Sequence, residues 1–141
     1  MLYAKEYFEG QESLVDIRFG ESDAMTICGD IHGQFLDLLN IFHIYGFPST
    51  SHFYLFNGDF VDRGPASLEV ILTLLTFKVL LPGQFFMARG NHESSHINKL
   101  YGFEKDVQRV YGEDDNMFLF FQQVFNTIPL CHVVQDKIFV S

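Results

Sequence analysis

Three short clusters of oxygen- and nitrogen-bearing side chains dominate the sequence, at residues 29–33, 58–64 and 89–93. Each cluster directly follows an apolar run, and the clusters recur at intervals of roughly 30 residues, the length of one βαβ unit. In an open α/β sheet, polar groups that follow consecutive strands gather at the carboxyl edge of the sheet. Carboxylate and imidazole groups at such an edge are typical ligands of divalent metal ions. The pattern therefore predicts a metal centre built from three neighbouring loops.

The residue types within the clusters suit hydrolysis of a phosphate ester. Asp30 and His32 are two residues apart, so in an extended segment both side chains point to one side and can bind one ion. Asp59 offers two carboxylate oxygens, which can bridge two ions about 3.5 to 4 Å apart. Asn91 adds a neutral amide oxygen, and His92 adds an adjacent imidazole. Water near such ions becomes a nucleophile close to neutral pH, and phosphoryl transfer needs mainly positioning and charge stabilisation.

Strands must deliver these clusters to one edge. Continuous apolar runs bounded by turn residues predict buried strands. Residues 14–17 alternate between apolar and polar side chains and form either a short strand or an extended arm. We expect the other strands at 24–28, 53–56 and 85–88, and a hairpin at 131–134 and 138–140.

Helices must connect the strands, and apolar residues at helical spacing predict them. The segment 66–80 is so uniformly apolar that we expect it to be buried on more than one side. Asp114 or Asp115 is a candidate N-cap for the last helix. One predicted helix has Phe35, Leu38, Leu39 and Phe42 at helical spacing and stops at Gly46, and the others lie at 66–80, 97–110 and 115–126.

Composition narrows the function classes. The chain has 141 residues and reads as a single folding unit over 1–141, with 48% apolar residues to build a core. Its formal charge of −9 argues against sequence-independent nucleic-acid binding, which needs Lys and Arg to neutralise phosphates. No apolar run reaches the roughly 20 residues of a membrane span. The two cysteines, Cys28 and Cys131, form no zinc-binding or disulfide pattern, so an intracellular location is expected.

Together, the three clusters resemble the motifs of a known family. Gly29-Asp30-Ile31-His32-Gly33, Gly58-Asp59-Phe60-Val61-Asp62-Arg63-Gly64 and Gly90-Asn91-His92-Glu93 are similar to the Gly-Asp-x-His-Gly, Gly-Asp-x-x-Asp-Arg-Gly and Gly-Asn-His-Glu motifs of the metallophosphoesterases. Within that family the sequence resembles the phosphoprotein phosphatases specific for serine and threonine. The resemblance implies an α/β fold with a layered sheet flanked by helices, of which only the amino-terminal half is present. It also implies phosphoprotein substrates and a location in the cytoplasm, extending to the nucleus.

The resemblance implies a role for each motif residue. Asp30 and His32 would bind the first metal ion, Asp59 would bridge both ions, and Asn91 would bind the second ion and contact substrate. The ions would be manganese, or iron paired with zinc.

The resemblance also implies the acid–base and phosphate-binding groups. His92 would be the general acid that protonates the leaving oxygen, and Asp62 would orient it. Arg63 would hold the phosphate oxygens, because its planar fork matches phosphate geometry. Tyr101 would lie near the substrate. His43, His52, His96 and His132 are expected to be structural or exposed.

The family also uses two histidines for its second metal ion and another arginine for the phosphate, and residues 1–141 do not supply them. We therefore expect an incomplete second site and a chain that is part of a longer catalytic domain. Two alternatives to a phosphoprotein phosphatase stay open. One is a catalytically incompetent fragment that binds one metal ion or a partner of unknown identity. The other is a dinucleoside-polyphosphate phosphoesterase.

Overall fold

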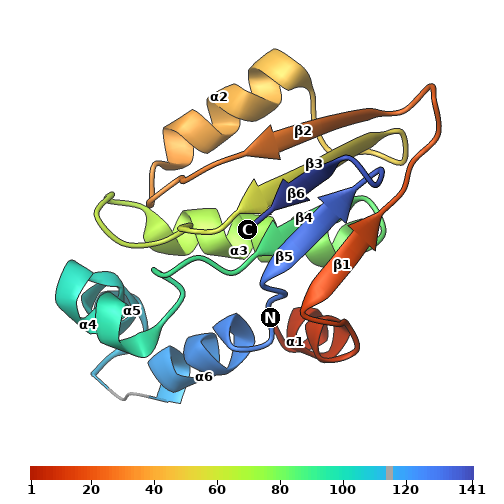
Figure 1. The fold of residues 1–141 in the computed structure, drawn as a ribbon. Helices are drawn as coiled ribbons and strands as arrows, with labels where there is room; N and C mark the ends of the chain where they lie inside the picture. The colour runs from red at the N-terminus through yellow and green to blue at the C-terminus, as the bar shows by residue number, and fades with distance from the viewer. Residues whose placement is uncertain (114–115) are drawn as a thin grey trace.

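A parallel three-stranded sheet forms the centre of the molecule in the computed structural model, which describes residues 1–113 and 116–141 (Figure 1). The strands lie in the order β2-β3-β4, with bounds Ala24–Cys28, His52–Asn57 and Phe85–Ala88. All three strands were predicted from their apolar runs. Cys28 pairs with Phe56, and Asn57 pairs with Ala88, so the three strands end nearly level. The three motif clusters therefore leave the sheet at the same edge.

A second three-stranded sheet covers one face of the first. It has the order β1-β5-β6, with β1 (Leu14–Ile17) parallel to β5 (Cys131–Val134) and β6 (Ile138–Val140) antiparallel to β5. Residues 14–17 are therefore a strand rather than an extended arm, and the predicted hairpin is confirmed. Side chains from both sheets form one buried apolar cluster, made of Ile17, Phe53, Leu55, Phe86, Val134 and Val140.

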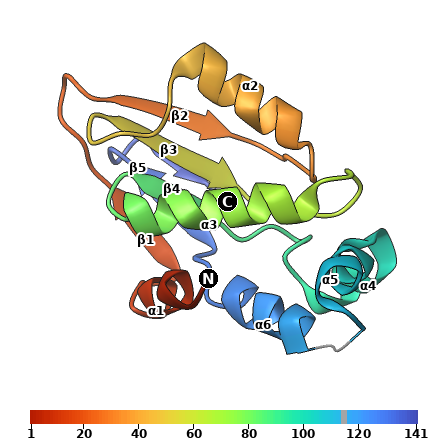
Figure 2. The same cartoon turned by 180° about the vertical axis from the view of Figure 1, so that it is seen from behind.

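Helices cover the other face of the central sheet (Figure 2). Successive side chains of a strand point to opposite faces, so Phe53 and Leu55 of β3 face the second sheet while Tyr54 and Phe56 face the helices. Burial on both faces explains why β3 reads as a continuous apolar run. The helices described here are α1 (Leu2–Glu9), α2 (Phe35–Tyr45), α3 (Ser67–Leu80), α4 (Ser95–Tyr101), α5 (Phe103–Tyr111) and α6 (Asn116–Phe125).

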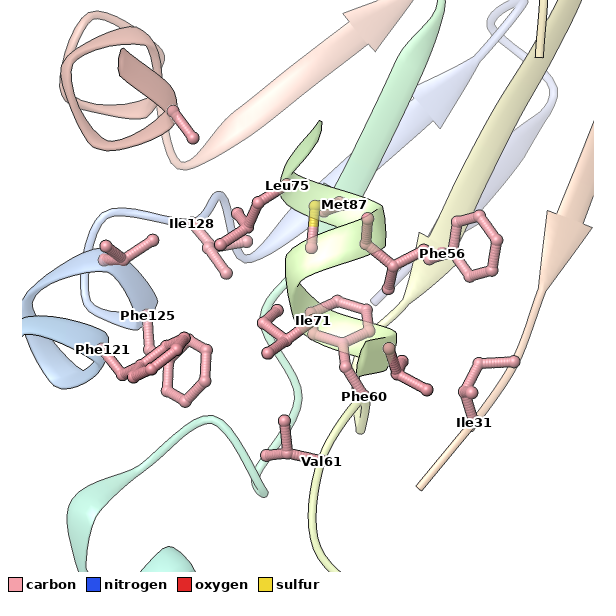
Figure 3. Packing of buried hydrophobic residues seen from close by; sticks show 14 of the residues in the cluster. Ile31, Phe56, Phe60, Val61, Ile71, Leu75, Met87, Phe121, Phe125 and Ile128 are labelled. Atoms are coloured by element: carbon pink, nitrogen blue, oxygen red, sulfur yellow. The ribbon is translucent and has the colours of Figure 1, made fainter. Parts of the chain in front are cut away.

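Helix α3 lies at the centre of the larger core. Its residues Ile71 and Leu75 lie between Phe56 of the sheet and Phe125 of α6 (Figure 3). This position confirms that the uniformly apolar segment 66–80 is buried on more than one side. Among the described residues, no helix is both long enough and apolar enough to span a membrane.

The prediction of a single helix at 97–110 is wrong in one respect, because Gly102 divides the segment into α4 and α5. Gly102 has a φ of 118°, in the left-handed region that glycine adopts easily, and it ends α4. The break frees the backbone N–H of Phe103 from the helical ladder, and that group donates to Asp62 Oδ1 at 2.9 Å. The interruption thus supplies a contact to the motif loops. The predicted cap at Asp114 or Asp115 lies outside the described residues.

A buried lysine fixes the end of α3. Lys78 Nζ donates to the carbonyl oxygens of Pro82 and Phe85 at 2.9 and 2.8 Å, and it lies over the rings of Tyr7, Phe8 and Phe86. Burial lowers the pKa of Lys78 to about 7. A neutral amine keeps two hydrogens, so both carbonyl contacts survive loss of the proton.

Stability should therefore rise with pH in the range where Lys78 is neutral when folded and charged when unfolded. Between about pH 7 and the ordinary lysine pKa near 10.4, unfolding takes up a proton, which increases the free energy of unfolding by up to about 1.4 kcal/mol per pH unit. Lys78→Met should remove this slope. Urea unfolding of both proteins at several pH values measures it, and the cysteine titrations cancel in the difference. Equal slopes would show that Lys78 is charged in the folded protein.

Candidate metal and catalytic site

Backbone hydrogen bonds hold the three motif loops against one another. The N–H groups of Ile31 and His32 both donate to the carbonyl oxygen of Asp59, at 3.1 and 2.9 Å, and the first loop is thereby fixed to the second. The Glu93 carboxylate joins the second loop to the third, because it accepts the backbone N–H groups of Asp59, Phe60 and Gly90 at 2.8 to 2.9 Å. The loops therefore form one rigid platform rather than three independent turns.

Glycines allow this close approach. A Cβ atom on Gly64 would overlap the carbonyl oxygen of His32, and a Cβ atom on Gly90 would overlap the backbone nitrogen and Oδ1 of Asp59. Each glycine thus lets one motif loop touch the next at the point where candidate metal ligands lie. Contact between loops thus explains Gly64 and Gly90, whereas a Cβ atom on Gly29 would meet nothing within 4 Å.

Gly90→Ala should consequently destabilise the platform. The methyl group must displace Asp59, so we expect a loss of about 1 to 3 kcal/mol in the free energy of unfolding, together with weaker manganese binding. Gly83→Ala is the matched control, because Gly83 is exposed and a Cβ atom there meets nothing within 4 Å. Urea unfolding and manganese titration of both variants give the comparison. Equal behaviour of the two variants would contradict the proposed tight contact.

His32 and Asp59 present donors to a common point. His32 Nδ1–H donates to the carbonyl oxygen of Val61 at 2.9 Å, which leaves Nε2 as the acceptor nitrogen. Donor atoms of His32, Asp59 and His92 all lie within 4.8 Å of one another. Among the described residues, this is the only group of three or more such side chains that could hold a metal ion. Backbone contact through one ring nitrogen is the usual way a ligating histidine is oriented. The arrangement fits a divalent ion bound by imidazole and carboxylate.

Asp30 and Asn91 lie at the rim of this group. Asp30 Oδ2 is 3.7 Å from His32 Nε2, and 63% of the Asp30 side chain is exposed, so its carboxylate can turn toward an ion held by His32. Asn91 is exposed, and its backbone carbonyl accepts the hydroxyl of Ser94 at 2.8 Å. It lines a shallow hollow beside the platform, together with Arg89 and other residues. Ligation by Asp30 and Asn91 stays a prediction.

His92 and Asp62 form a buried acid–base pair. His92 Nδ1–H donates to Asp62 Oδ2 at 2.9 Å, and both side chains are almost fully inaccessible. Arg63 Nη2–H donates to the other ring nitrogen, Nε2, at 3.3 Å. Both nitrogens of His92 thus have protein partners. The Asp62 contact suits a proton donor, because it stabilises a ring that takes up its second proton at Nε2 once Arg63 turns away. His92 also belongs to the same donor group as His32 and Asp59.

Arg63 and Tyr101 lie beside His92 on the exposed side. The rings of His92 and Tyr101 are 5.1 Å apart in an edge arrangement, and the Arg63 guanidinium lies 5.6 Å from the centroid of the Tyr101 ring. Both residues are exposed. The structure therefore brings Asp62, Arg63, His92 and Tyr101 together, as the family resemblance implies. An exposed cation next to a buried imidazole is suited to bind a phosphate anion.

Two buried residues of the site have no role in the motif interpretation. Glu93 is fully buried under the loops, and its burial raises its pKa to about 7 against the opposing effect of its three backbone N–H contacts. Asn98 is also fully buried and donates to Asp62 and to the backbone of His92. Glu93 belongs to the third motif, so the sequence could have indicated that it takes part in the site. Nothing in the sequence indicates a role for Asn98, because it resembles an ordinary polar residue in a helix.

The remaining histidines lie away from the site. His43 and His96 are exposed on helices, and His52 bonds to Thr26 Oγ1 at 2.8 Å. His132 is buried, and burial together with the charge of Lys78 lowers its pKa to about 4. Their positions agree with the structural or exposed roles expected of them.

A layered α/β fold that gathers aspartate, histidine and asparagine at one sheet edge is the architecture of a metal-dependent phosphoesterase. Residues 25–141 match the calcineurin-like phosphoesterase family, and the chain belongs to that family.

Comparison with individual proteins gives a finer likeness. The chain is 52% identical over 141 residues to serine/threonine-protein phosphatase 5 of Solanum lycopersicum, covering 99% of this chain and 25% of that protein. It is 45% identical to serine/threonine-protein phosphatase 5 of Homo sapiens over 140 residues, covering 99% of this chain and 28% of that protein. The chain thus spans about a quarter of the length of these curated relatives.

Solved structures show the same likeness. A protein serine/threonine phosphatase from Saccharomyces cerevisiae, similar to human phosphatase PP5, superimposes with a TM-score of 0.93 at 41% identity, over 98% of this chain and 44% of that one. A putative diadenosine tetraphosphatase superimposes with a TM-score of 0.62 at 20% identity, over 91% of this chain and 53% of that one. The second likeness shows the fold alone.

Proposed function

We propose that this chain carries part of the active site of a metal-dependent phosphatase that hydrolyses phosphoserine and phosphothreonine in proteins. One observation carries the proposal: the buried His92–Asp62 pair lies beside the donor group of His32 and Asp59, with Arg63 at its open side. The pair supplies a proton donor, the donor group supplies ligands, and Arg63 supplies a phosphate contact. The relatives named serine/threonine phosphatases support the substrate class.

The ligand assignment follows the donor chemistry. Asp30, His32 and Asp59 would hold the first ion, and Asp59 with Asn91 would contribute to the second. Bound divalent ions would supply positive charge and make water nucleophilic near neutral pH. The sequence itself is acidic, at −9, so ions are the natural source of charge for a phosphate anion. We propose manganese, or iron with zinc, as the ions.

The chain's own residues account for the remaining chemistry. Arg63 would orient the phosphate through charge-assisted hydrogen bonds and hold it next to His92. His92 would give a proton to the leaving serine or threonine oxygen. Asp62 accepts His92 Nδ1–H, so it fixes the tautomer and stabilises the protonated ring. Asn91 and Tyr101 would contact substrate at the rim.

Substrate comparison tests this function. We expect the purified protein with manganese to hydrolyse a phosphoserine peptide and to leave diadenosine tetraphosphate largely intact. The opposite preference would favour the dinucleoside-polyphosphate alternative. Failure on both substrates, with manganese bound, would favour the catalytically incompetent alternative for this chain.

Metal stoichiometry is a separate expected outcome. Asp30, His32 and Asp59 would give the first ion three side chains, whereas among the described residues we assign only Asp59 and Asn91 to the second ion. We therefore expect one tightly bound manganese ion per chain, measured by calorimetric titration and by elemental analysis after dialysis. Two tightly bound ions per chain would contradict this division of ligands.

A further inference from the structure

We propose that Gln122 of α6 is a positioning residue for the His92–Asp62 pair and that it acts through Asn98. This inference rests on the proposed function, because it concerns the proton donor of that reaction. Gln122 lies outside the three motifs, on a helix that follows them in the chain. Its side-chain amide nevertheless belongs to a series of buried hydrogen bonds that connects it to His92.

The series consists of three consecutive contacts. Gln122 Nε2–H donates to Asn98 Oδ1 at 2.8 Å, Asn98 Nδ2–H donates to Asp62 Oδ2 at 2.8 Å, and His92 Nδ1–H donates to the same Asp62 oxygen at 2.9 Å. All four side chains are buried. Hydrogen bonds in such surroundings are stronger than in water, and leaving one unmade is costly.

Gln122 supports the orientation of the Asn98 amide that serves Asp62. Asn98 Nδ2 carries two hydrogens, which serve Asp62 Oδ2 and the carbonyl oxygen of His92, at 2.8 and 2.6 Å. A flipped amide would turn its oxygen toward a carboxylate and a carbonyl, both of which are acceptors. A flipped amide would also turn its NH₂ group toward the donor of Gln122. The Gln122 contact therefore stabilises the Asn98 orientation in which the amide donates to Asp62.

Asp62 in turn depends on this orientation. Its Oδ2 accepts from both Asn98 and His92, while its Oδ1 accepts the N–H of Phe103 at 2.9 Å. Three donors from three elements thus fix the carboxylate in one rotamer. Loss of the Asn98 contact would let the carboxylate and the attached imidazole rotate, and Nε2 of His92, the nitrogen that would carry the proton for the leaving oxygen, would lose its position.

Gln122→Glu tests the proposal, because it preserves shape and replaces the NH₂ donor with an oxygen acceptor. Gln123→Glu is the matched control, since Gln123 is the next residue of α6 and is exposed. The first readout is the Asn98 side-chain NH₂ pair in ¹⁵N–¹H spectra of the full chain, which needs no catalysis. We expect slow hydrogen exchange of this pair in the wild type and in Gln123→Glu, and at least about tenfold faster exchange in Gln122→Glu.

The second readout separates positioning from a general loss of structure. A p-nitrophenolate leaves without a proton, whereas a serine alkoxide needs one, so a displaced acid slows phosphoserine hydrolysis selectively. With manganese, we expect Gln122→Glu to lower kcat for a phosphoserine peptide about tenfold more than kcat for p-nitrophenyl phosphate. Gln123→Glu should leave both rates unchanged.

Two results would overturn the proposal: an Asn98 NH₂ pair still protected in Gln122→Glu, or equal losses on both substrates. Should the charge prevent folding, Gln122→Met replaces the donor with an apolar side chain of similar size, and the same two readouts apply. A wild-type chain that hydrolyses neither substrate would count against the proposed function, and the exchange of the Asn98 pair would then decide the inference by itself.

Discussion

Asp59→Asn is expected to lower phosphopeptide hydrolysis by about 10³-fold or more. Asp59 Oδ1 already accepts the backbone N–H of His92 at 2.9 Å. An asparagine would keep its oxygen on that contact, so its NH₂ group would point toward the donor atoms of His32. An amide NH₂ group repels a cation where a carboxylate oxygen would bind it. The variant should therefore lose metal affinity and activity together, measured by manganese titration and by phosphate release.

Asp136→Asn controls for the change of charge. Asp136 is exposed in the turn between β5 and β6, where it pairs with Arg18. We expect this variant to bind manganese and to hydrolyse phosphopeptide like the wild type. Undiminished turnover by Asp59→Asn, with a normal urea unfolding curve, would refute the bridging role of Asp59.

The sequence predicted the central sheet well because its strands are buried on both faces. A segment such as 52–57, which is packed between helices and a second sheet, must be apolar throughout, and such runs are easily recognised. Once the three parallel strands are in place, the loops after them must meet at one edge. The convergence of Asp30, His32, Asp59 and His92 thus followed from strand order rather than from any local signal.

The parts that were missed depend on contacts between distant residues. Local periodicity at 97–110 is helical on both sides of Gly102, so the sequence does not indicate the break. The break goes with a distant contact, in which the backbone N–H of Phe103 donates to Asp62. Gln122 and Asn98 are 24 residues apart and read as unrelated polar positions on two helices. Residue type alone indicates neither contact, because each depends on how helices pack across the core.

The second large expected effect concerns the proton donor. His92→Asn should slow phosphoserine hydrolysis by about 10²- to 10⁴-fold, the usual contribution of a general acid. The loss on p-nitrophenyl phosphate should be much smaller, because its leaving group needs no proton. Rates for both substrates measured side by side in the presence of manganese give the comparison. His96→Asn, on the exposed face of α4, makes the same substitution four residues away and should leave both rates unchanged.

Manganese affinity of the His92→Asn protein decides between the two roles open to this imidazole. His92 belongs to one donor group with His32 and Asp59, yet Asp62 and Arg63 already occupy its two ring nitrogens. A proton donor can be removed without loss of the ion, so we expect manganese binding within about threefold of the wild type. A large fall in affinity, with equal losses on both substrates, would make His92 a ligand instead. The Asp62 contact would then serve to orient a metal-bound ring, as carboxylates commonly do for ligating histidines.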